Sequence, residues 1–202
     1  KILNGTARNI GVNKSSKKSD LISFCDSDDL WKPIKIKNQI NFMLKEKSGV
    51  CFTNYDFYNP KKNKYIINYF KIPFTRINFS LLGITNLIGT SSVLMNKNLF
   101  KEVGGFPESK YFYSFEDYFL WLKIARKINF HYLDENLTIY RDDRKNSATK
   151  YSRSFLSQRL RLLIFFLFTL DIKYFLKLVA SNLKLIFTNK NKSNNHEYIN
   201  LL

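Results

Sequence analysis

Short apolar runs of strand length alternate with segments of helical periodicity along most of the chain. Short apolar runs bounded by turn signals are typical of buried strands, whereas apolar residues three or four apart indicate amphipathic helices. The strand-like runs lie at residues 21–25, 50–55, 93–95, 130–133 and 138–141. Segments of helical character lie at residues 5–12, 33–49 and 98–103 and behind Asp117. This alternation predicts an α/β fold. Residues 56–79 are rich in lysine and tyrosine and weakly periodic, which indicates either irregular strands or an excursion from the fold.

The ends of two predicted helices carry recognisable signals. Pro33 suits a first helical turn and Gly49 suits the end of the helix that follows it. Farther along, Ser114 stands three residues before Asp117, which resembles a capping box at the start of a helix. The apolar faces of the two helices contain Ile36, Ile40, Met43 and Leu44 in the first, and Trp121, Ile124 and Ile128 in the second.

Three carboxylates follow the first strand-like run. Asp26, Asp28 and Asp29 come directly after residues 21–25, which places them at the carboxyl end of a strand, where open α/β sheets bind their ligands. Clustered carboxylates repel one another unless a cation neutralises them, and hard oxygen ligands favour Mg²⁺ or Mn²⁺ together with phosphate. The alternative is a polar turn whose acids cap the helix near Pro33. A calcium loop of the EF-hand type fits poorly, because Leu30 and Trp31 stand where that loop needs glycine.

The charge of the chain is strongly positive and unevenly distributed. Its 202 residues include 33 Lys and Arg against 16 Asp and Glu, a net charge of +17. Between Arg144 and Lys192, eleven basic residues face one acid, so this stretch carries +10. Such asymmetry indicates an anionic partner, which could be nucleic acid, a membrane surface or a phosphorylated substrate. Cys25 and Cys51 lie in apolar runs and have no metal-binding spacing, so we expect free thiols.

The last quarter of the chain changes character. Residues 160–170 are almost entirely apolar but too few to span a bilayer. Residues 171–187 predict an amphipathic helix with a stripe formed by Lys173, Lys177, Ser181 and Lys184. Such a helix suits a membrane interface, and equally a helix packed on its own domain. We therefore divide the chain into residues 1–147, a basic helical tail at 148–190 and a polar tail at 191–202.

Taken in order, the motifs of residues 5–147 resemble the family-2 glycosyltransferases, which are inverting enzymes with a GT-A fold. The matching segments are residues 6–11 (TARNIG), 24–31 (FCDSDDLW), Lys35 with Gln39, 54–55 (NY), 90–93 (TSSV), 104–106 (GGF), 116–122 (EDYFLWL) and 140–141 (YR). The resemblance implies a Rossmann-like mixed sheet flanked by helices. Family members begin with strands that precede Lys1 here, so we expect a fragment that lacks its N-terminal strands.

The resemblance also implies a nucleotide-sugar donor and a divalent metal, Mn²⁺ or Mg²⁺. Asp26 and Asp28 match the DXD element, in which the first acid faces the donor and a later acid holds the metal. Because Asp29 follows directly, either Asp28 or Asp29 is the main metal ligand. Arg8 matches the arginine that approaches the donor nucleotide, and we expect Asn9 to stabilise its loop.

Asp117 matches the catalytic base of the family, and Glu116 its supporting acid. A simpler interpretation is that both acids only stabilise the dipole of the helix they begin. The resemblance places Ser91, Ser92, Trp121 and Arg141 on the acceptor side. Many relatives have a histidine after the pair matched by Tyr140 and Arg141, whereas this chain continues with two aspartates, an arginine and a lysine.

These observations predict metal-dependent, inverting sugar transfer to a saccharide or lipid-linked acceptor in bacterial surface polysaccharide or glycolipid synthesis. The start of the chain has no apolar signal region, which predicts a location at the inner face of the plasma membrane. The alternatives are a truncated, inactive remnant and a basic module that binds membrane or nucleic acid. No RRM, KH or zinc signature occurs, so we expect no nucleic acid partner.

Overall fold

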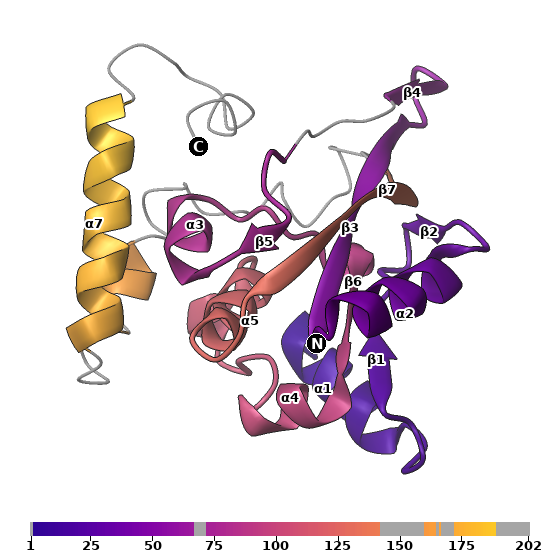
Figure 1. Cartoon of the computed structure of the whole chain (residues 1–202), viewed down its shortest axis with the longest axis horizontal. Coiled ribbons are helices and arrows are strands. Elements are labelled where there is room, and N and C mark those ends of the chain that lie inside the picture. Colours follow the sequence, from indigo (N-terminus) through magenta and orange to yellow (C-terminus); the bar gives the residue numbers. More distant parts are fainter. Residues whose placement is uncertain (1, 67–71, 142–159, 165, 167–171, 189–202) are drawn as a thin grey trace.

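The computed structural model describes residues 2–66, 72–141, 160–164, 166 and 172–188 (Figure 1). Within them, seven strands form one mixed sheet in the order β1-β6-β3-β7-β2, with β4 paired to β3 and β5 to β7. The strands are β1 (Leu21–Ser23), β2 (Leu30–Trp31), β3 (Val50–Asn59), β4 (Lys64–Ile66), β5 (Arg76–Ile77), β6 (Val93–Asn96) and β7 (Phe130–Arg141). The helices are α1 (Asn4–Lys14), α2 (Lys35–Glu46), α3 (Phe79–Ile84), η1 (Thr90–Ser92), α4 (Lys97–Glu102), η2 (Lys110–Phe112), α5 (Glu116–Ala125) and α7 (Ile172–Thr188).

Helices cover both faces of the sheet, as Figure 1 shows for α2 and α5 on either side of β3. Successive residues of a strand point to opposite faces. Phe52 of β3 packs in the main core with Trp121 of α5, whereas its neighbour Cys51 packs with Met43 of α2. The predicted α/β class, a mixed sheet flanked by helices, is confirmed.

The two central strands are longer than the sequence predicts. Strands β3 and β7 pair in parallel, and β7 is one continuous strand where we expected separate strands at 130–133 and 138–141. The register shifts between Thr53 and Tyr55, and this irregularity accommodates the polar residues in the middle of β7. Strand β3 also continues to Asn59, and the short strands β4 and β5 follow, so residues 56–79 contain the irregular strands that were one interpretation of this segment.

The N-terminus of α5 differs from the predicted capping box. The N-cap position belongs to Phe115, and Ser114 adopts a left-handed backbone with φ of 71°. Its hydroxyl oxygen is buried without a hydrogen-bond partner. The start of the helix therefore has no side-chain cap and is fixed by the ring of Phe115, which packs in the core.

Helix α1 is fixed to the loop after α4 by the side chain of Asn9. Its amide nitrogen donates to the carbonyl oxygen of Phe106 at 2.9 Å, and its amide oxygen accepts from the N–H of Phe106 at 3.0 Å. Gly105 has φ of +62°, and a Cβ there would lie 2.6 Å from Oδ1 of Asn9. We expected Asn9 to stabilise its own loop, but residues 4–14 form helix α1, and Asn9 instead holds a loop 97 residues away in the chain.

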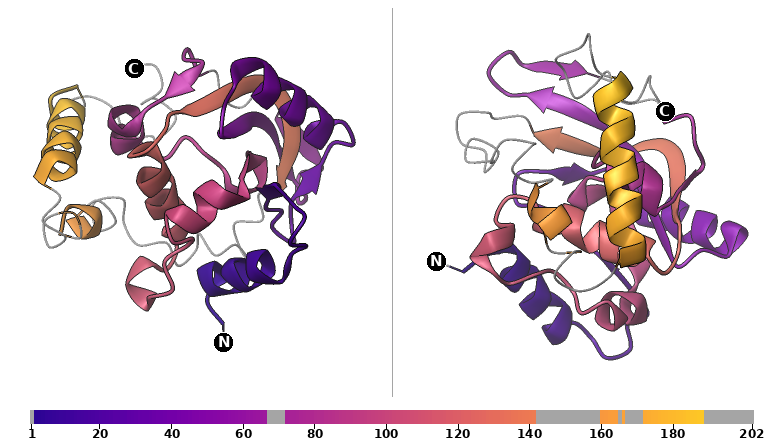
Figure 2. Two further views of the ribbon diagram at one scale, coloured as in Figure 1. Left: turned by 60° about the horizontal axis from the view of Figure 1, so that its bottom comes forward. Right: turned by 90° about the vertical axis from the view of Figure 1, so that its left-hand side faces the viewer.

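The C-terminal helix α7 packs on α3 through one face and leaves another exposed. The ring of Tyr174 lies 4.8 Å from that of Phe79, and Leu178 is buried. Ile172, Leu176 and Leu183 remain exposed. Figures 1 and 2 place α7 at the periphery, on the side of the molecule away from α2.

No helix in the described part of the chain is both long and apolar enough to cross a bilayer. The polar tail at 191–202 and residues 142–145 lie outside the described residues.

We expect Gly105→Ala to lower the free energy of unfolding by about 1–3 kcal/mol, because it combines a left-handed backbone with a clash against Asn9. Gly11→Ala is the matched control. Gly11 lies in α1, where an added methyl group would have no neighbour within 4 Å, so alanine should raise stability by about 0.5–1 kcal/mol. Urea denaturation of both variants measures the difference, and equal effects would contradict this account of the α1 contact.

Candidate active site

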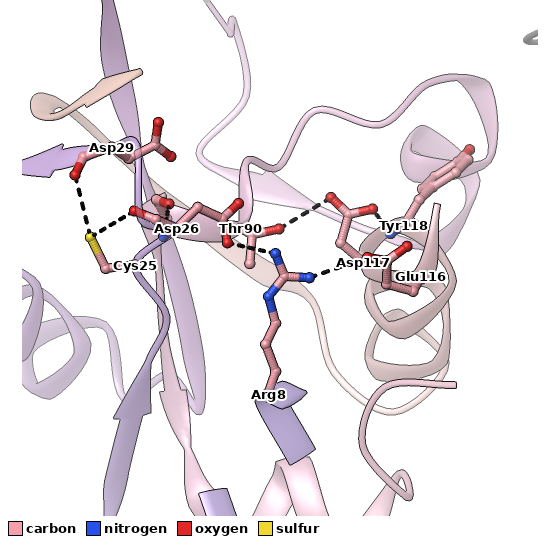
Figure 3. A network of polar contacts seen from close by, with 9 residues as sticks. Arg8, Cys25, Asp26, Asp29, Thr90, Glu116, Asp117 and Tyr118 are labelled. Atoms are coloured by element: carbon pink, nitrogen blue, oxygen red, sulfur yellow. Dashed lines mark hydrogen bonds and ion pairs between the residues drawn. The ribbon is translucent and has the colours of Figure 1, made fainter. Parts of the chain in front are cut away.

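Four segments of the chain meet beside the connection between β1 and β2 (Figure 3). The acidic segment, residues 26–29, connects β1 to β2, and the acids Glu116 and Asp117 begin α5. Arg8 reaches between them from α1, and Thr90 of η1 approaches from the side. The structure thus brings together Arg8, Asp26, Glu116 and Asp117, which the sequence assigned to one site.

Arg8 joins the two acidic groups directly. Its Nη2 lies 2.5 Å from Oδ1 of Asp26, and its Nη1 lies 3.4 Å from Oε1 of Glu116. Burial by itself lowers the pKa of the Arg8 guanidinium. The negative charges of Asp26, Asp117 and Glu116 raise that pKa by more than burial lowers it, so the net shift is upward. Arg8 therefore stays charged and offsets the repulsion between carboxylates from opposite sides of the site.

Asp117 is positioned by two hydrogen bonds. Its Oδ2 accepts from the hydroxyl of Thr90 at 3.2 Å, and its Oδ1 accepts from the N–H of Tyr118 at 2.7 Å. Burial, followed by the charge of Glu116, raises the pKa of Asp117 to about 6, although Arg8 and the two hydrogen bonds act in the opposite direction. A carboxyl with this pKa is deprotonated at neutral pH and can accept a proton more readily than an ordinary aspartate.

The three acids of the acidic segment differ in accessibility. Asp28 is exposed and Asp26 is partly exposed, whereas only 6% of Asp29 is exposed. Oδ1 of Asp29 accepts from the N–H of Arg141 at 3.2 Å, and Oδ2 is buried without a hydrogen-bond partner. Burial raises the pKa of Asp29 to about 6.

These residues fit a hard divalent cation. Among the described residues, no three metal-ligating side chains cluster closely enough to form a complete site. Mg²⁺, however, typically uses only one or two protein carboxylates and completes its shell with water and substrate phosphates. The unpaired Oδ2 of Asp29 and the exposed carboxylate of Asp28 offer such oxygen ligands.

Of the four residues expected on the acceptor side, three are buried and one is exposed. Ser91, Ser92 and Trp121 are at most 2% exposed, so none of these side chains can contact an acceptor in this conformation. The indole N–H of Trp121 instead donates to the carbonyl of Ile88, just before η1, at 3.2 Å. Of the four, only Arg141 is exposed.

Thr90 is the residue that the sequence-based list of site residues lacks. Its contact with Asp117 joins η1 to α5, which are 27 residues apart in the chain. The only sequence signal for Thr90 is its place in the motif at residues 90–93, from which the sequence predicts Ser91 and Ser92 as site residues.

Comparison with known proteins identifies the family. The model of the glycosyltransferase-like family 2 matches residues 3–200, almost the whole chain. The chain belongs to this family. The family expected from the ordered motifs is thereby confirmed.

Several curated relatives are similar over part of their length. WfgD of Escherichia coli, named as a UDP-Glc:α-D-GlcNAc-diphosphoundecaprenol β-1,3-glucosyltransferase, is 33% identical over 123 residues, which are 61% of this chain and 44% of WfgD. WfaP of Escherichia coli, with the same named activity, is 36% identical over 110 residues, covering 54% of this chain and 40% of WfaP. An uncharacterized glycosyltransferase of Rickettsia felis is 31% identical over 140 residues, 67% of this chain and 22% of its own length. The chain thus spans less than half the length of each of these relatives.

Solved structures support the fold. TarS 1–349 of S. aureus, a GT-A glycosyltransferase, superposes with a TM-score of 0.58 at 15% identity, covering 97% of this chain and 56% of TarS 1–349. TarS 1–349 in complex with UDP-GlcNAc gives a TM-score of 0.57, covering 80% and 45% of the two chains. At this identity the likeness shows the GT-A fold, as expected from the motifs.

Proposed function

We propose that this chain carries the site for metal-dependent, inverting transfer of a sugar from a nucleotide-sugar donor to an acceptor hydroxyl. The observation that carries the proposal is the double contact of Arg8 with Asp26 and Glu116. It holds Asp26, which we expect to meet the donor, near Glu116, the neighbour of the expected base Asp117. The family and the GT-A fold support the same reaction class.

In this proposal Asp117 is the catalytic base. Its carboxylate accepts the proton of the acceptor hydroxyl while that oxygen forms a bond to the anomeric carbon of the donor sugar. The bond from the anomeric carbon to the diphosphate oxygen breaks on the opposite face, so the configuration inverts and the nucleoside diphosphate leaves. Thr90 and the N–H of Tyr118 orient the carboxylate, and Glu116 keeps Arg8 in place.

Asp26 and Arg8 form the donor side of the site, and Asp28 with Asp29 would hold the metal. Asp28 is the more accessible ligand, and Asp29 offers one buried oxygen, Oδ2, without a hydrogen-bond partner. A bound divalent cation supplies neutralisation of the charge that develops on the leaving diphosphate.

Asp117→Asn should lower kcat for sugar transfer by about 10²–10⁴, because the amide cannot accept the proton. The donor KM should change little, since Asp117 acts on the acceptor. The matched control is Glu102→Gln, which removes an exposed carboxylate on α4. Initial rates with donor and acceptor check the prediction, and full activity of the Asp117 variant would rule out its role as base.

We further propose that the acceptor is lipid-linked and that the chain works at the inner face of the plasma membrane, in surface polysaccharide or glycolipid synthesis. The named acceptors of WfgD and WfaP, which carry diphosphoundecaprenol, support this choice. In this proposal residues 1–147 are the catalytic unit, residues 148–190 are the tail that contacts the membrane, and residues 191–202 are a polar segment.

The outer surface of α7 is the proposed membrane contact. Ile172, Leu176 and Leu183 are 60%, 58% and 48% exposed, an unusual set of large apolar side chains on one helix. Lys173 and Lys177 are exposed beside them. Apolar residues flanked by lysines suit the surface of an anionic bilayer, which also complements the net charge of +17.

The protein should therefore float with vesicles that contain anionic phospholipid and much less with zwitterionic vesicles. The double variant Leu176→Ser with Leu183→Ser should reduce the bound fraction by about tenfold or more, because two apolar side chains no longer enter the interface. Leu44→Ser on α2 is the control, since Leu44 is 73% exposed and far from α7 in sequence. Equal flotation of the double variant and the parent would contradict this contact.

A further inference from the structure

A lysine side chain is fully buried beneath the acidic segment. Lys35, in the first turn of α2, is 0% exposed. Its Nζ donates to Oε1 of Gln39 at 2.7 Å and to the hydroxyl of Ser23 at 3.3 Å, and it lies 4.2 Å from the centre of the Trp31 ring. None of these three partners carries a formal charge, so within the described part of the chain the ammonium is held by dipoles and by an aromatic face.

Such a side chain is costly for the fold. An ammonium loses its hydration on burial, and neutral partners return only part of that free energy. The cost is visible in the pKa of Lys35, which burial lowers to about 8. A methionine has a similar shape and would fill the same space without it. A role beyond stability therefore accounts better for a lysine here.

The contacts of Lys35 fall on both ends of the segment that carries the acids. Ser23 is the last residue of β1, and Trp31 is the last residue of β2. Asp26, Asp28 and Asp29 all lie between them. The ammonium group of Lys35 thus contacts Ser23, at the end of β1 before the acidic segment, and Trp31, in the strand β2 that follows this segment.

The same cluster also holds η1, which in turn contacts the acidic segment. The indole N–H of Trp31 donates to the carbonyl of Ser91 at 2.8 Å, and the amide of Gln39 donates to the carbonyl of Ser92 at 2.9 Å. The hydroxyl of Ser91 in turn accepts from the N–H of Asp26 at 3.0 Å. A continuous set of polar contacts therefore runs from Lys35 to the backbone of Asp26.

We propose that Lys35 is a positioning residue that fixes the acidic segment, through Ser23 and Trp31, in the conformation that meets the donor diphosphate and its metal. This inference rests on the proposed function of the acidic segment and assigns a further residue to it. Lys35 is too deeply buried to touch the donor, so it acts only through the segment above it.

The test separates positioning from stability. Lys35→Met should leave the free energy of unfolding unchanged or raise it, because a buried charge is replaced by an apolar side chain of similar shape. The donor KM and the Mn²⁺ concentration for half-maximal rate should rise about 10–100-fold, the range for residues that orient metal ligands, with a smaller change in kcat. Lys37→Met, at an exposed position of the same helix, is the control.

A second variant examines the connection itself. Trp31→Phe keeps an aromatic face for the ammonium but removes the hydrogen bond to Ser91, so it should weaken donor and Mn²⁺ binding in the same direction. Lower stability or loss of folding in Lys35→Met, with donor KM unchanged in Trp31→Phe, would overturn the inference and make Lys35 a purely structural residue.

Calorimetric titration of the parent protein with UDP-sugars and Mn²⁺ distinguishes this failure from failure of the proposed function. If the parent binds no nucleotide sugar, the proposed function fails. If the parent and Lys35→Met bind equally well, only the inference about Lys35 fails.

Discussion

The ion pairs of Arg8 are the contact on which the geometry of the candidate site depends. Asp26, Glu116 and Asp117 would repel one another at close range without a cation between them. Arg8 is positioned by α1, and α1 is held by the contact of Asn9 with the loop at Gly105 and Phe106. The sequence motifs around residues 8–9 and 104–106 are therefore two sides of one structural contact.

The acids of the candidate site are supported in different ways according to the chemistry proposed for them. Asp117 is partly shielded from water and has a raised pKa, which suits proton transfer. The acidic segment is more open, with Asp28 exposed, and is held by Lys35, Trp31 and η1. The α5 side of the candidate site thus suits a base, and the acidic segment suits a metal and phosphates.

Local patterns predicted the local features of this fold. The spacing of Ile36, Ile40, Met43 and Leu44 predicted helix α2 within two residues of its start, because one apolar face is enough to define an amphipathic helix. Leu44 was wrongly placed on the buried face, since it is 73% exposed. Features that depend on distant partners were missed. The parallel partner β3 makes β7 continuous, and core packing replaces the expected serine cap of α5. Thr90 is recognised as a site residue only by its hydrogen bond to Asp117, which no local sequence pattern encodes.

The central claim is that Arg8 couples the donor side to Asp117, and the pH dependence of kcat at saturating donor tests it directly. In the parent protein kcat should fall as the pH decreases through about 6, where Asp117 becomes protonated. Arg8→Gln should move this acidic limb to higher pH, because the charge of Arg8 lowers the pKa of Asp117. Lys14→Gln, which removes an exposed charge from the same helix, should leave the limb in place. An acidic limb at the same pH in Arg8→Gln and the parent would contradict the coupling.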